Sequence, residues 1–354
     1  MCSALWPRDV RAVANIDLGA IERNCRRLPT PLCAVVKANA YGHGTVPVAE
    51  AALRGGAEWL AVATAAEAAE LRAGGIEVPV LVMGGLTSDE LQTAIDADAD
   101  VVAWTEEVAD AAPRVHVKLD TGMSRLGTKE LELARRLAAR PNVVGLMTHF
   151  ATADELGDDF FGAQLAIFRD FVAAVGRDDL LTHAANSAAA LRDPASHFDM
   201  VRCGVAIYGL DPFQNDPADH GLEPALTLRS WVAALRRLEA GESAGYGRRW
   251  TAKQPTWLAT VPIGYGDGWR RALTNNADVL IGGRRQPVVG AVSMDNITVA
   301  LGADADVAVG EEVVLIGAQG EERILAEELA RRLGTINYEV TTGLLPRVTR
   351  EHGR

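Results

Sequence analysis

Residues 34–44 read AVVKANAYGHG, an apolar run followed at once by a lysine and a glycine-containing segment. The run predicts a buried β-strand, and the small residues after it predict a strand-to-helix turn that lets a ligand approach the backbone. Lys37 stands where the strand ends. Burial disfavours the ammonium form of a lysine and favours the neutral amine, which attacks aldehyde carbons. Lys37 is therefore the leading candidate for a reactive residue.

The pattern around this turn repeats along the chain. From residue 13 to 222, short apolar runs alternate with helical patterns, which is typical of a parallel sheet with crossover helices. Eight candidate strands suggest a closed barrel, so the predicted fold is α/β, a (β/α)8 TIM-like barrel. The candidate strands are 34–37, 59–63, 78–83, 100–104, 115–119, 143–148, 180–183 and 205–208.

Local signals support the strand-to-helix turns. Thr64 with Glu67, and Thr87 with Glu90, each form a capping-box pattern after a strand, and Gly74 can end the helix between them. In such barrels the active site lies at the carboxyl ends of the strands, so residues just past each strand take priority. The residues that qualify are Lys37, Arg125, His149, Ser187 and Gly204.

After Gly221 the sequence pattern changes and predicts a second, mostly β domain over residues 223–354. Strands separated by glycine-bearing turns are expected, with a hairpin at Gly282-Gly283 and one short helix over 324–333. Residues 1–12 are expected to pack on this domain. The predicted strands are 225–238, 257–263, 279–281, 288–292 and 313–316.

Composition excludes several classes of partner. The 354-residue chain carries a formal charge of −12, which disfavours nucleic acid and anionic membranes because both require a basic face. No apolar stretch approaches the roughly 20 residues that span a bilayer, and the N-terminus lacks a signal-peptide core, so we expect a cytoplasmic protein. The four cysteines lack metal-ligand spacing, so no metal is expected, and Cys33 and Cys203 are interpreted as buried small hydrophobes.

The lysine motif closely resembles the pyridoxal-phosphate lysine motif of the alanine racemases. Two further segments are similar to that family: residues 118–127, KLDTGMSRLG, and residues 200–209, MVRCGVAIYG. The resemblance covers both domains, up to residues 337–340, NYEV. It implies that Lys37 is bonded covalently to pyridoxal 5'-phosphate.

The resemblance also assigns the residues that hold the cofactor. It implies that Arg202 faces the pyridine nitrogen, whereas the residues alone leave a structural ion pair as the alternative. An arginine keeps its proton, so the nitrogen would stay unprotonated and reprotonation at the α-carbon would be favoured over transamination. Ser187, with a helix cap as its alternative, and the N–H groups near Gly204 and Val205 are expected to bind the phosphate, and Tyr41 to add a hydroxyl.

Three more residues of the barrel match family positions. Arg125 would lie near the substrate carboxylate, which a guanidinium fork binds well. Lys118 corresponds to a lysine that is carbamylated in some members and positions this arginine. His149 matches a histidine that packs against the cofactor ring. From the residues alone, a solvent-facing arginine and a satisfied core histidine remain open.

Racemisation removes a proton from one face of the α-carbon and returns it to the other, so two opposed bases are natural. Lys37 serves one face, and Tyr246 in the second domain is predicted to serve the other. Tyr265, Met294 and Asp295 also match site-lining positions of the family. In the family, the tyrosine that matches Tyr246 and the residues that match Met294 and Asp295 reach the lysine of the other subunit, so the resemblance implies a homodimer with shared active sites.

The predicted activity is interconversion of L-alanine and D-alanine, which would supply D-alanine for cell-wall synthesis. Three alternatives stay open: a serine or broad-specificity racemase, a non-catalytic pyridoxal-phosphate carrier on the same barrel, and a decarboxylase or aldolase on a related fold. The match weakens over residues 341–347, TTGLLPR, where many racemases carry a tyrosine near the cofactor phosphate.

Overall fold

The computed structural model describes residues 10–353, which form two compact units. One unit comprises residues 18–223 and the other comprises residues 10–17 together with residues 224–353. Strand β1 (Val13–Asp17) belongs to the second unit, so the barrel unit begins later than the predicted residue 13. The expectation for residues 1–9 lies outside the described residues.

The unit of residues 18–223 is built on a sheet of parallel strands, eight in the described part of the chain. They follow one another in the order β8-β7-β6-β5-β4-β3-β2-β9. Their bounds are β2 Leu32–Val35, β3 Ala57–Val62, β4 Val80–Val82, β5 Asp100–Ala103, β6 Val115–Lys118, β7 Val143–Met147, β8 Leu181–His183 and β9 Val201–Cys203.

The two end strands of this sheet approach each other. The Asp199 N–H donates to the Thr182 carbonyl at 2.9 Å, and the Arg202 N–H donates to the Ala185 carbonyl at 2.9 Å. These bonds link the segments around β8 and β9, so the sheet forms a nearly closed barrel. The predicted fold class is confirmed.

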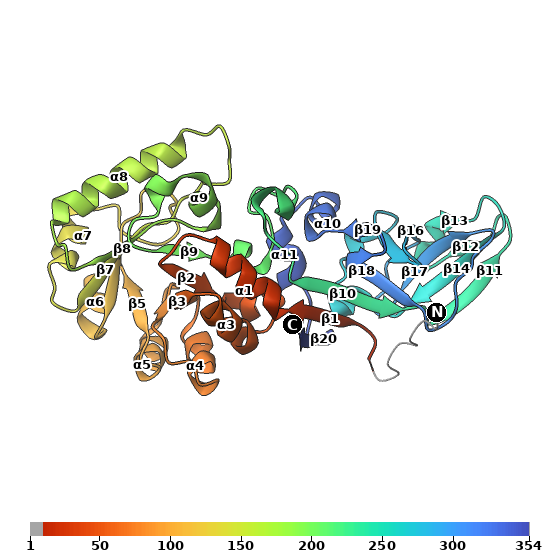
Figure 1. The fold of residues 1–354 in the computed structure, drawn as a ribbon, viewed down its shortest axis with the longest axis horizontal. Coiled ribbons are helices and arrows are strands. Elements are labelled where there is room, and N and C mark those ends of the chain that lie inside the picture. The colour runs from red at the N-terminus through yellow and green to blue at the C-terminus, as the bar shows by residue number, and fades with distance from the viewer. Residues whose placement is uncertain (1–9, 354) are drawn as a thin grey trace. The chain divides into compact units, whose positions relative to one another are not determined.

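Helices follow the strands and lie on the outside of the barrel (Figure 1). Both predicted capping boxes are present, at Thr64–Glu67 and Thr87–Glu90, and Gly74 is the residue after α4. The helices are α1 Leu18–Arg27, α3 Thr45–Arg54, α4 Ala65–Ala73, α5 Ser88–Asp96, α6 Glu106–Ala111, α7 Leu131–Ala138, α8 Phe160–Val175 and α9 Ser187–Arg192.

The last predicted barrel strand is wrong. The segment Val205–Tyr208 is a 3-10 helix, and the strand is Val201–Cys203 just before it. All four residues of the helix are buried, and a short buried apolar run has the same composition in a strand and in a helix. Arg202 is consequently a residue of the strand itself.

The second unit is a mostly antiparallel sheet in the order β11-β14-β17-β16-β15-β18-β10-β1-β20, with β19 beside β18 and a separate ribbon of β12 and β13. The predicted strand 225–238 is two strands, β10 (Leu226–Trp231) and β11 (Ala234–Leu238). The others are β12 Ser243–Ala244, β13 Trp250–Thr251, β14 Thr256–Val261, β15 Asp278–Ile281, β16 Arg284–Val289, β17 Ile297–Gly302, β18 Glu312–Gln319, β19 Glu322–Ile324 and β20 Thr349–Gly353.

Turn chemistry explains the joints of this unit. Gly282 and Gly283 have φ of +58° and +72°, and they connect β15 to β16 as the predicted hairpin. Helix α10 (Ala326–Leu333) ends at Gly334, whose φ of +68° is the left-handed conformation that favours glycine. A second helix, α11 (Asn337–Thr342), follows it.

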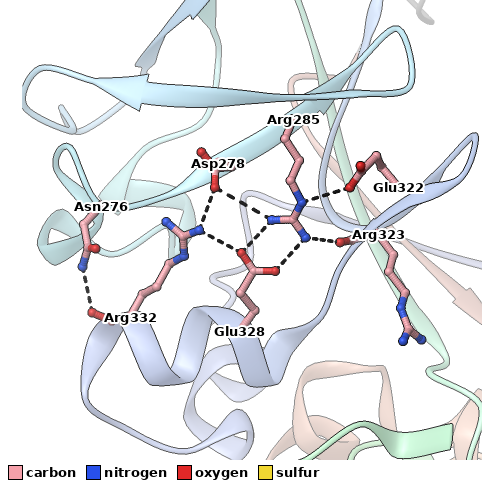
Figure 2. A network of polar contacts seen from close by, with 7 residues as sticks. All are labelled: Asn276, Asp278, Arg285, Glu322, Arg323, Glu328 and Arg332. Atoms are coloured by element: carbon pink, nitrogen blue, oxygen red, sulfur yellow. Dashed lines mark hydrogen bonds and ion pairs between the residues drawn. The ribbon is translucent and has the colours of Figure 1, made fainter.

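A network of charged side chains joins α10 to the sheet (Figure 2). The Arg285 guanidinium contacts Glu328 at 2.8 Å and Glu322 at 3.0 Å, and it also donates to the Arg323 carbonyl. Arg332 pairs with Asp278 at 2.6 Å and with Glu328 at 3.0 Å. The network therefore connects β15, β16, β19 and α10.

Cys33 and Cys203 are fully buried and free, as predicted. Burial raises the pKa of the Cys33 thiol to about 12, so it stays protonated and behaves as a small apolar residue. Across residues 10–353, none of the helices has the length and apolar character to cross a bilayer.

Candidate active site

Lys37 begins an unusual turn directly after β2. Residues 38–41 all have positive φ, between +50° and +54°, so the segment α2 (Lys37–Gly42) is a left-handed turn rather than an ordinary helix. Such a conformation costs each non-glycine residue about 1 kcal/mol or more, so the surrounding structure must hold it. Hydrogen bonds from Ala40 N–H to the Val36 carbonyl and from Gly44 N–H to the Asn39 carbonyl close the turn.

Glu67 anchors this turn from the neighbouring helix. One carboxylate oxygen accepts from the Ala38 N–H at 2.6 Å, and the other accepts from the N–H groups of Ala63 and Thr64 at 2.8 and 3.1 Å. The residue that completes the predicted capping box therefore also fixes the backbone after Lys37. Sequence reasoning identified the cap and missed this second contact, because the two segments are far apart along the chain.

The Lys37 amine is half-buried. Burial lowers its pKa, the nearby Arg125 lowers it further, and Glu67 partly opposes both effects. A lowered pKa increases the fraction of neutral amine, which is the form that reacts with carbonyl carbons. The position and electrostatics of Lys37 thus suit the predicted role.

A small polar cradle lies at the carboxyl ends of β8 and β9. The Ser187 hydroxyl accepts from the Gly204 N–H at 3.0 Å and from the Ala206 N–H at 3.3 Å. The helix cap is instead Asn186, whose side chain accepts from the Ala189 N–H. Ser187 is therefore not a plain cap, and Val205 lies between the two N–H groups that Ser187 joins.

Tyr41, in the turn that begins at Lys37, lies beside Gly204. It is buried and stacks on Tyr208 with ring centroids 4.8 Å apart. A Cβ added at Gly204 would lie 2.4 Å from the Tyr41 hydroxyl oxygen, so glycine is required at this position. The predicted phosphate-binding residues thus come together in space.

Arg202 lies inside the barrel, with 3% of its surface exposed. It donates to the carbonyls of Thr148 and Ala184 at 2.9 and 3.1 Å and to the Nδ1 atom of His183 at 2.8 Å. Among residues 10–353, none of its hydrogen-bond partners is a carboxylate, so the structural ion pair is not the arrangement found. Burial lowers the pKa of Arg202 to about 10, which leaves it charged at neutral pH.

Lys118 and Arg125 come from β6 and the loop after it. The Lys118 side chain is buried, and burial together with Arg202 and Arg125 lowers its pKa to about 8. The Asp120 carboxylate accepts from the N–H groups of Gly122 and Ser124, both at 3.0 Å, and so shapes the loop that carries Arg125. Arg125 itself is exposed.

His149 follows β7 and lies beside Arg202, whose guanidinium contacts its Nδ1 atom at 3.4 Å. Burial and the charges of Arg202 and Lys118 hold the pKa of His149 well below its usual range, so the ring is neutral. A neutral, half-buried ring at this end of the barrel suits packing against an aromatic ligand.

Together these residues suit an anionic aldehyde cofactor. Arg202, Arg125 and Lys37 lie close enough to Lys118 to lower its pKa, and Asp120 only partly offsets them. Cationic side chains and paired backbone N–H groups bind phosphate and carboxylate, while a neutral amine binds an aldehyde. The donor set therefore fits pyridoxal phosphate and an amino-acid carboxylate.

The second unit carries the other predicted residues. Tyr246, Tyr265, Met294 and Asp295 line one pocket of about 780 Å³. Tyr246, which is 76% exposed, projects from a turn whose Gly245 and Gly247 have positive φ. The structure thus gathers the candidates into two sets, one on each unit.

Backbone hydrogen bonds connect the two loops that line this pocket. The N–H groups of Tyr265 and Gly266 donate to the carbonyls of Ser293 and Met294 at 3.1 and 2.9 Å. The buried Asp267 carboxylate accepts from the Gly264 N–H at 2.9 Å. The loop that carries Tyr265 is therefore hydrogen-bonded to the loop that carries Asp295.

Arg347 is a residue of this pocket region that sequence reasoning missed. Its guanidinium pairs with Asp267 at 3.1 Å and with Asp295 at 2.8 Å. The residue stands in the segment 341–347, where the family resemblance weakens. No sequence signal connects it to Asp267, because the pairing depends on how distant loops fold together.

Comparison with known proteins places this geometry in a family. The alanine racemase N-terminal domain matches residues 16–212, and the alanine racemase C-terminal domain matches residues 225–352. The chain belongs to the alanine racemase family. Among curated relatives, the alanine racemase of Symbiobacterium thermophilum is 43% identical over 363 residues, covering 96% of each chain. Alanine racemase 1 of Bacillus subtilis is 40% identical, covering 95% of this chain and 92% of the relative.

Solved structures of alanine racemases have the same fold. The alanine racemase from E. faecalis is 37% identical, with a TM-score of 0.92 that covers 99% of this chain and 100% of the other. The alanine racemase from Streptomyces lavendulae is also 37% identical, with a TM-score of 0.91 and 98% coverage of both chains. The recognition made from the lysine motif is thereby confirmed over both units.

Proposed function

We propose that the protein interconverts L-alanine and D-alanine as a pyridoxal-phosphate-dependent racemase. The observation that carries this proposal is the half-buried Lys37 amine, with a lowered pKa, beside Arg125 in a chain of the alanine racemase family. Relatives that match nearly the whole chain carry the name alanine racemase.

The barrel residues would hold the cofactor. When bound, pyridoxal phosphate supplies a conjugated electron sink that makes the α-proton of an amino acid acidic. Lys37 would bond to the aldehyde carbon, and His149 would pack against the cofactor ring. The N–H groups near Gly204 and Val205, with the hydroxyls of Ser187 and Tyr41, bind the phosphate.

Arg202 would set the reaction outcome by contacting the pyridine nitrogen of the bound cofactor. Because its guanidinium keeps its own proton, it would donate a hydrogen bond without transferring that proton. Return of a proton to the α-carbon would then be favoured over transamination. The absence of a carboxylate among its contacts in residues 10–353 supports this role.

Two bases act on opposite faces of the α-carbon. Lys37, released when the substrate amine takes its place on the cofactor, would remove the proton from D-alanine, and Tyr246 of the partner subunit would remove it from L-alanine. Tyrosine has a pKa of about 10 and needs positive charge nearby to act as a base at neutral pH. The cationic side chains around Lys37 supply that field in the proposed homodimer.

The substrate is a small amino acid. Arg125 binds its carboxylate through the guanidinium fork. Tyr265, Met294 and Asp295 of the partner subunit line the entrance and limit the side chain to a small group. A methyl and a hydroxymethyl group differ little, so the same site sets only a modest preference between alanine and serine.

Lys118 is proposed to be carbamylated. Its amine, with a pKa of about 8, is partly neutral near pH 7. The nitrogen lone pair forms a bond to the carbon of CO2, one C=O electron pair moves to oxygen, and one proton leaves to solvent. The resulting anion would offset the charges of Arg125 and Arg202 and hold Arg125 in place.

In the cell, we propose that the enzyme acts in the cytoplasm and supplies D-alanine for cell-wall synthesis. This role rests on family membership rather than on a feature of the site.

The proposal is tested by incubating the cofactor-loaded protein with L-alanine in deuterated water. We expect deuterium at the α-carbon together with loss of optical rotation. A cofactor carrier gives neither change, and a decarboxylase releases carbon dioxide instead. Either result would overturn the proposed activity.

A second measurement identifies the cofactor-bearing residue. Borohydride reduction followed by peptide mapping should place the cofactor on Lys37. The exposed Lys253 offers a matched control, so Lys253→Arg should retain the label and Lys37→Arg should lose it. A label on another residue would contradict the mechanism.

A further inference from the structure

A line of hydrogen-bonded side chains crosses the interior of the barrel from Arg202 to Arg114. Arg202 contacts the Nδ1 atom of His183 at 2.8 Å, and the Nε2 atom of His183 lies 2.7 Å from Nδ1 of His116. Nε2 of His116 lies 3.2 Å from one oxygen of Asp100, whose other oxygen accepts from Arg114 at 2.5 Å. The line connects β9, β8, β6 and β5.

The two ends of the line determine the tautomers of both histidines. An arginine only donates, so His183 must accept at Nδ1 and therefore carries its proton on Nε2. That proton is donated to Nδ1 of His116, which leaves the His116 proton on Nε2. An ionised carboxylate only accepts, so Asp100 receives this last donor. No other choice of tautomers gives each contact in the line one donor and one acceptor.

The charges of the groups agree with that assignment. Burial and the charge of Arg202 hold the pKa of His183 well below its usual range, so its ring is neutral. Burial alone would raise the pKa of Asp100, but hydrogen bonds from His116 and Arg114 lower it overall. The carboxylate is therefore ionised at neutral pH.

The side chains of this line fit inside the barrel because a neighbouring position carries no side chain. A Cβ at Gly145 would lie 2.3 Å from Nδ1 of His116, so the adjacent strand can carry only glycine there. His116 and His183 are both fully buried. The rings of Trp59 and His116 form a T-shaped pair with centroids 5.7 Å apart.

We propose that Asp100 and His116 are positioning residues for Arg202. They act through His183, because they keep its Nδ1 atom as the acceptor for the Arg202 guanidinium. Asp100 is the first residue of β5 and does not itself contact Arg202. This inference rests on the proposed function, because the orientation of Arg202 matters for catalysis only if it faces the cofactor ring. Its consequence is that a change at Asp100 shifts the reaction from racemisation towards transamination.

The substitution Asp100→Asn tests the line with little change in shape. Because Arg114 only donates, the amide oxygen turns to Arg114 and the amide NH2 group turns to His116. His116 must then accept at Nε2, which reverses its tautomer and that of His183. The His183 Nδ1–H group would face the Arg202 N–H donor, and their hydrogen bond would be lost. Asp98→Asn is the matched control, since Asp98 pairs with the same arginine at 2.8 Å from the exposed side.

Two readouts on the holoenzyme report the outcome. Histidine nitrogen NMR, assigned with an His183→Asn variant, should show the Nε2–H tautomer of His183 in the wild type and in Asp98→Asn, and its loss in Asp100→Asn. Pyruvate formed from alanine per racemisation event should rise about tenfold or more in Asp100→Asn, the size of one lost hydrogen bond to a charged group, and stay unchanged in Asp98→Asn.

If Asp100→Asn fails to fold, His116→Leu gives a second test, because its apolar side chain takes the acceptor away from His183 and the donor away from Asp100, and the pyruvate ratio should again rise. An unchanged His183 tautomer in a folded Asp100→Asn variant would overturn the inference, as would an unchanged pyruvate ratio in either folded variant. The NMR result does not depend on turnover. Absence of any wild-type racemisation would therefore count against the proposed function alone.

Discussion

At the scale of single residues, Lys37 and Lys118 of the barrel have different neighbours. Lys37 is opposed by Glu67 on the adjacent helix, whereas Lys118 lies among Arg202, Arg125 and Lys37 with Asp120 as its counter-charge. Both pKa values fall because burial penalises the ammonium form. The neutral amine of Lys37 is the form that bonds to carbonyl carbons, and a neutral Lys118 adds no charge to its cationic surroundings.

The lowered pKa of Lys118 predicts a pH dependence of stability. Between about pH 8 and the unfolded lysine pKa of about 10.4, the unfolded chain holds a proton that the folded chain has lost, so the free energy of unfolding rises with pH. We expect this rise to be smaller in Lys118→Met by about 1–3 kcal/mol. Urea unfolding of both proteins in CO2-free buffer at pH 8 and pH 10 measures it. Parallel pH profiles would show that Lys118 titrates normally.

At the scale of elements, two identical local motifs have unequal consequences. The capping boxes of α4 and α5 both fix a helix start, but only the carboxylate of the first, Glu67, also binds the backbone N–H of Ala38. A pattern of four residues predicts each cap correctly. The additional contact depends on the packing of α4 beside the turn that begins at Lys37.

This difference provides a matched pair of variants. Glu67→Gln removes the charge that favours the Lys37 ammonium, so the pKa of Lys37 should fall further. Glu90→Gln alters the equivalent cap at Thr87 and should leave Lys37 unchanged. The measurement is the pH dependence of cofactor bonding to Lys37, followed by absorbance. An equal shift in both variants would show that the cap itself, and not the contact with Ala38, controls the amine.

The charged network of Figure 2 predicts a stability effect within the second unit. Arg285 contacts groups on α10 and β19, and the carboxylates around it raise its pKa above the ordinary arginine value. We expect Arg285→Ala to lower the free energy of unfolding by about 1 kcal/mol, because several partners lose their counter-charge together. The neighbouring exposed residue gives the control Arg284→Ala, which should change stability by less than about 0.5 kcal/mol. Chemical denaturation measures both.

At the scale of the whole molecule, the candidate residues form two sets on two units. Lys37, Lys118, Arg125, His149 and Arg202 belong to the barrel, and Tyr246, Tyr265, Met294 and Asp295 belong to the β unit. In the proposed homodimer, the barrel set of one copy would join the β set of the other and place a base on each face of the substrate. Such sharing would make activity depend on assembly.

Complementation tests this arrangement. Lys37→Ala and Tyr246→Phe should each be inactive in converting L-alanine, because each lacks one base. Mixed after subunit exchange, they should recover about a quarter of wild-type activity, since half of the dimers are mixed and each of these has one intact site. Racemisation assays before and after exchange measure it. No recovery, with mixed dimers demonstrated by mass spectrometry, would show that both bases come from one copy.

The sequence by itself determined the class of fold and the family. Alternating apolar runs indicated the barrel, capping boxes marked two of its turns, and the motif at Lys37 indicated the family. These signals are local, since each depends on residues a few positions apart. The strand predicted at 205–208 was wrong because a buried apolar run has the same composition in a strand as in a 3-10 helix.

Tertiary structure decided the electrostatics and the support of the site. The left-handed turn after Lys37, the contact of Glu67 with Ala38, the pairing of Arg347 with Asp295 and the line from Arg202 to Asp100 all join segments distant in sequence. Hydrogen bonds and charge interactions act over a few ångströms of space, whatever the separation along the chain. Residue types at a motif therefore identify the chemistry, while the protonation and orientation of those residues follow only from the folded barrel.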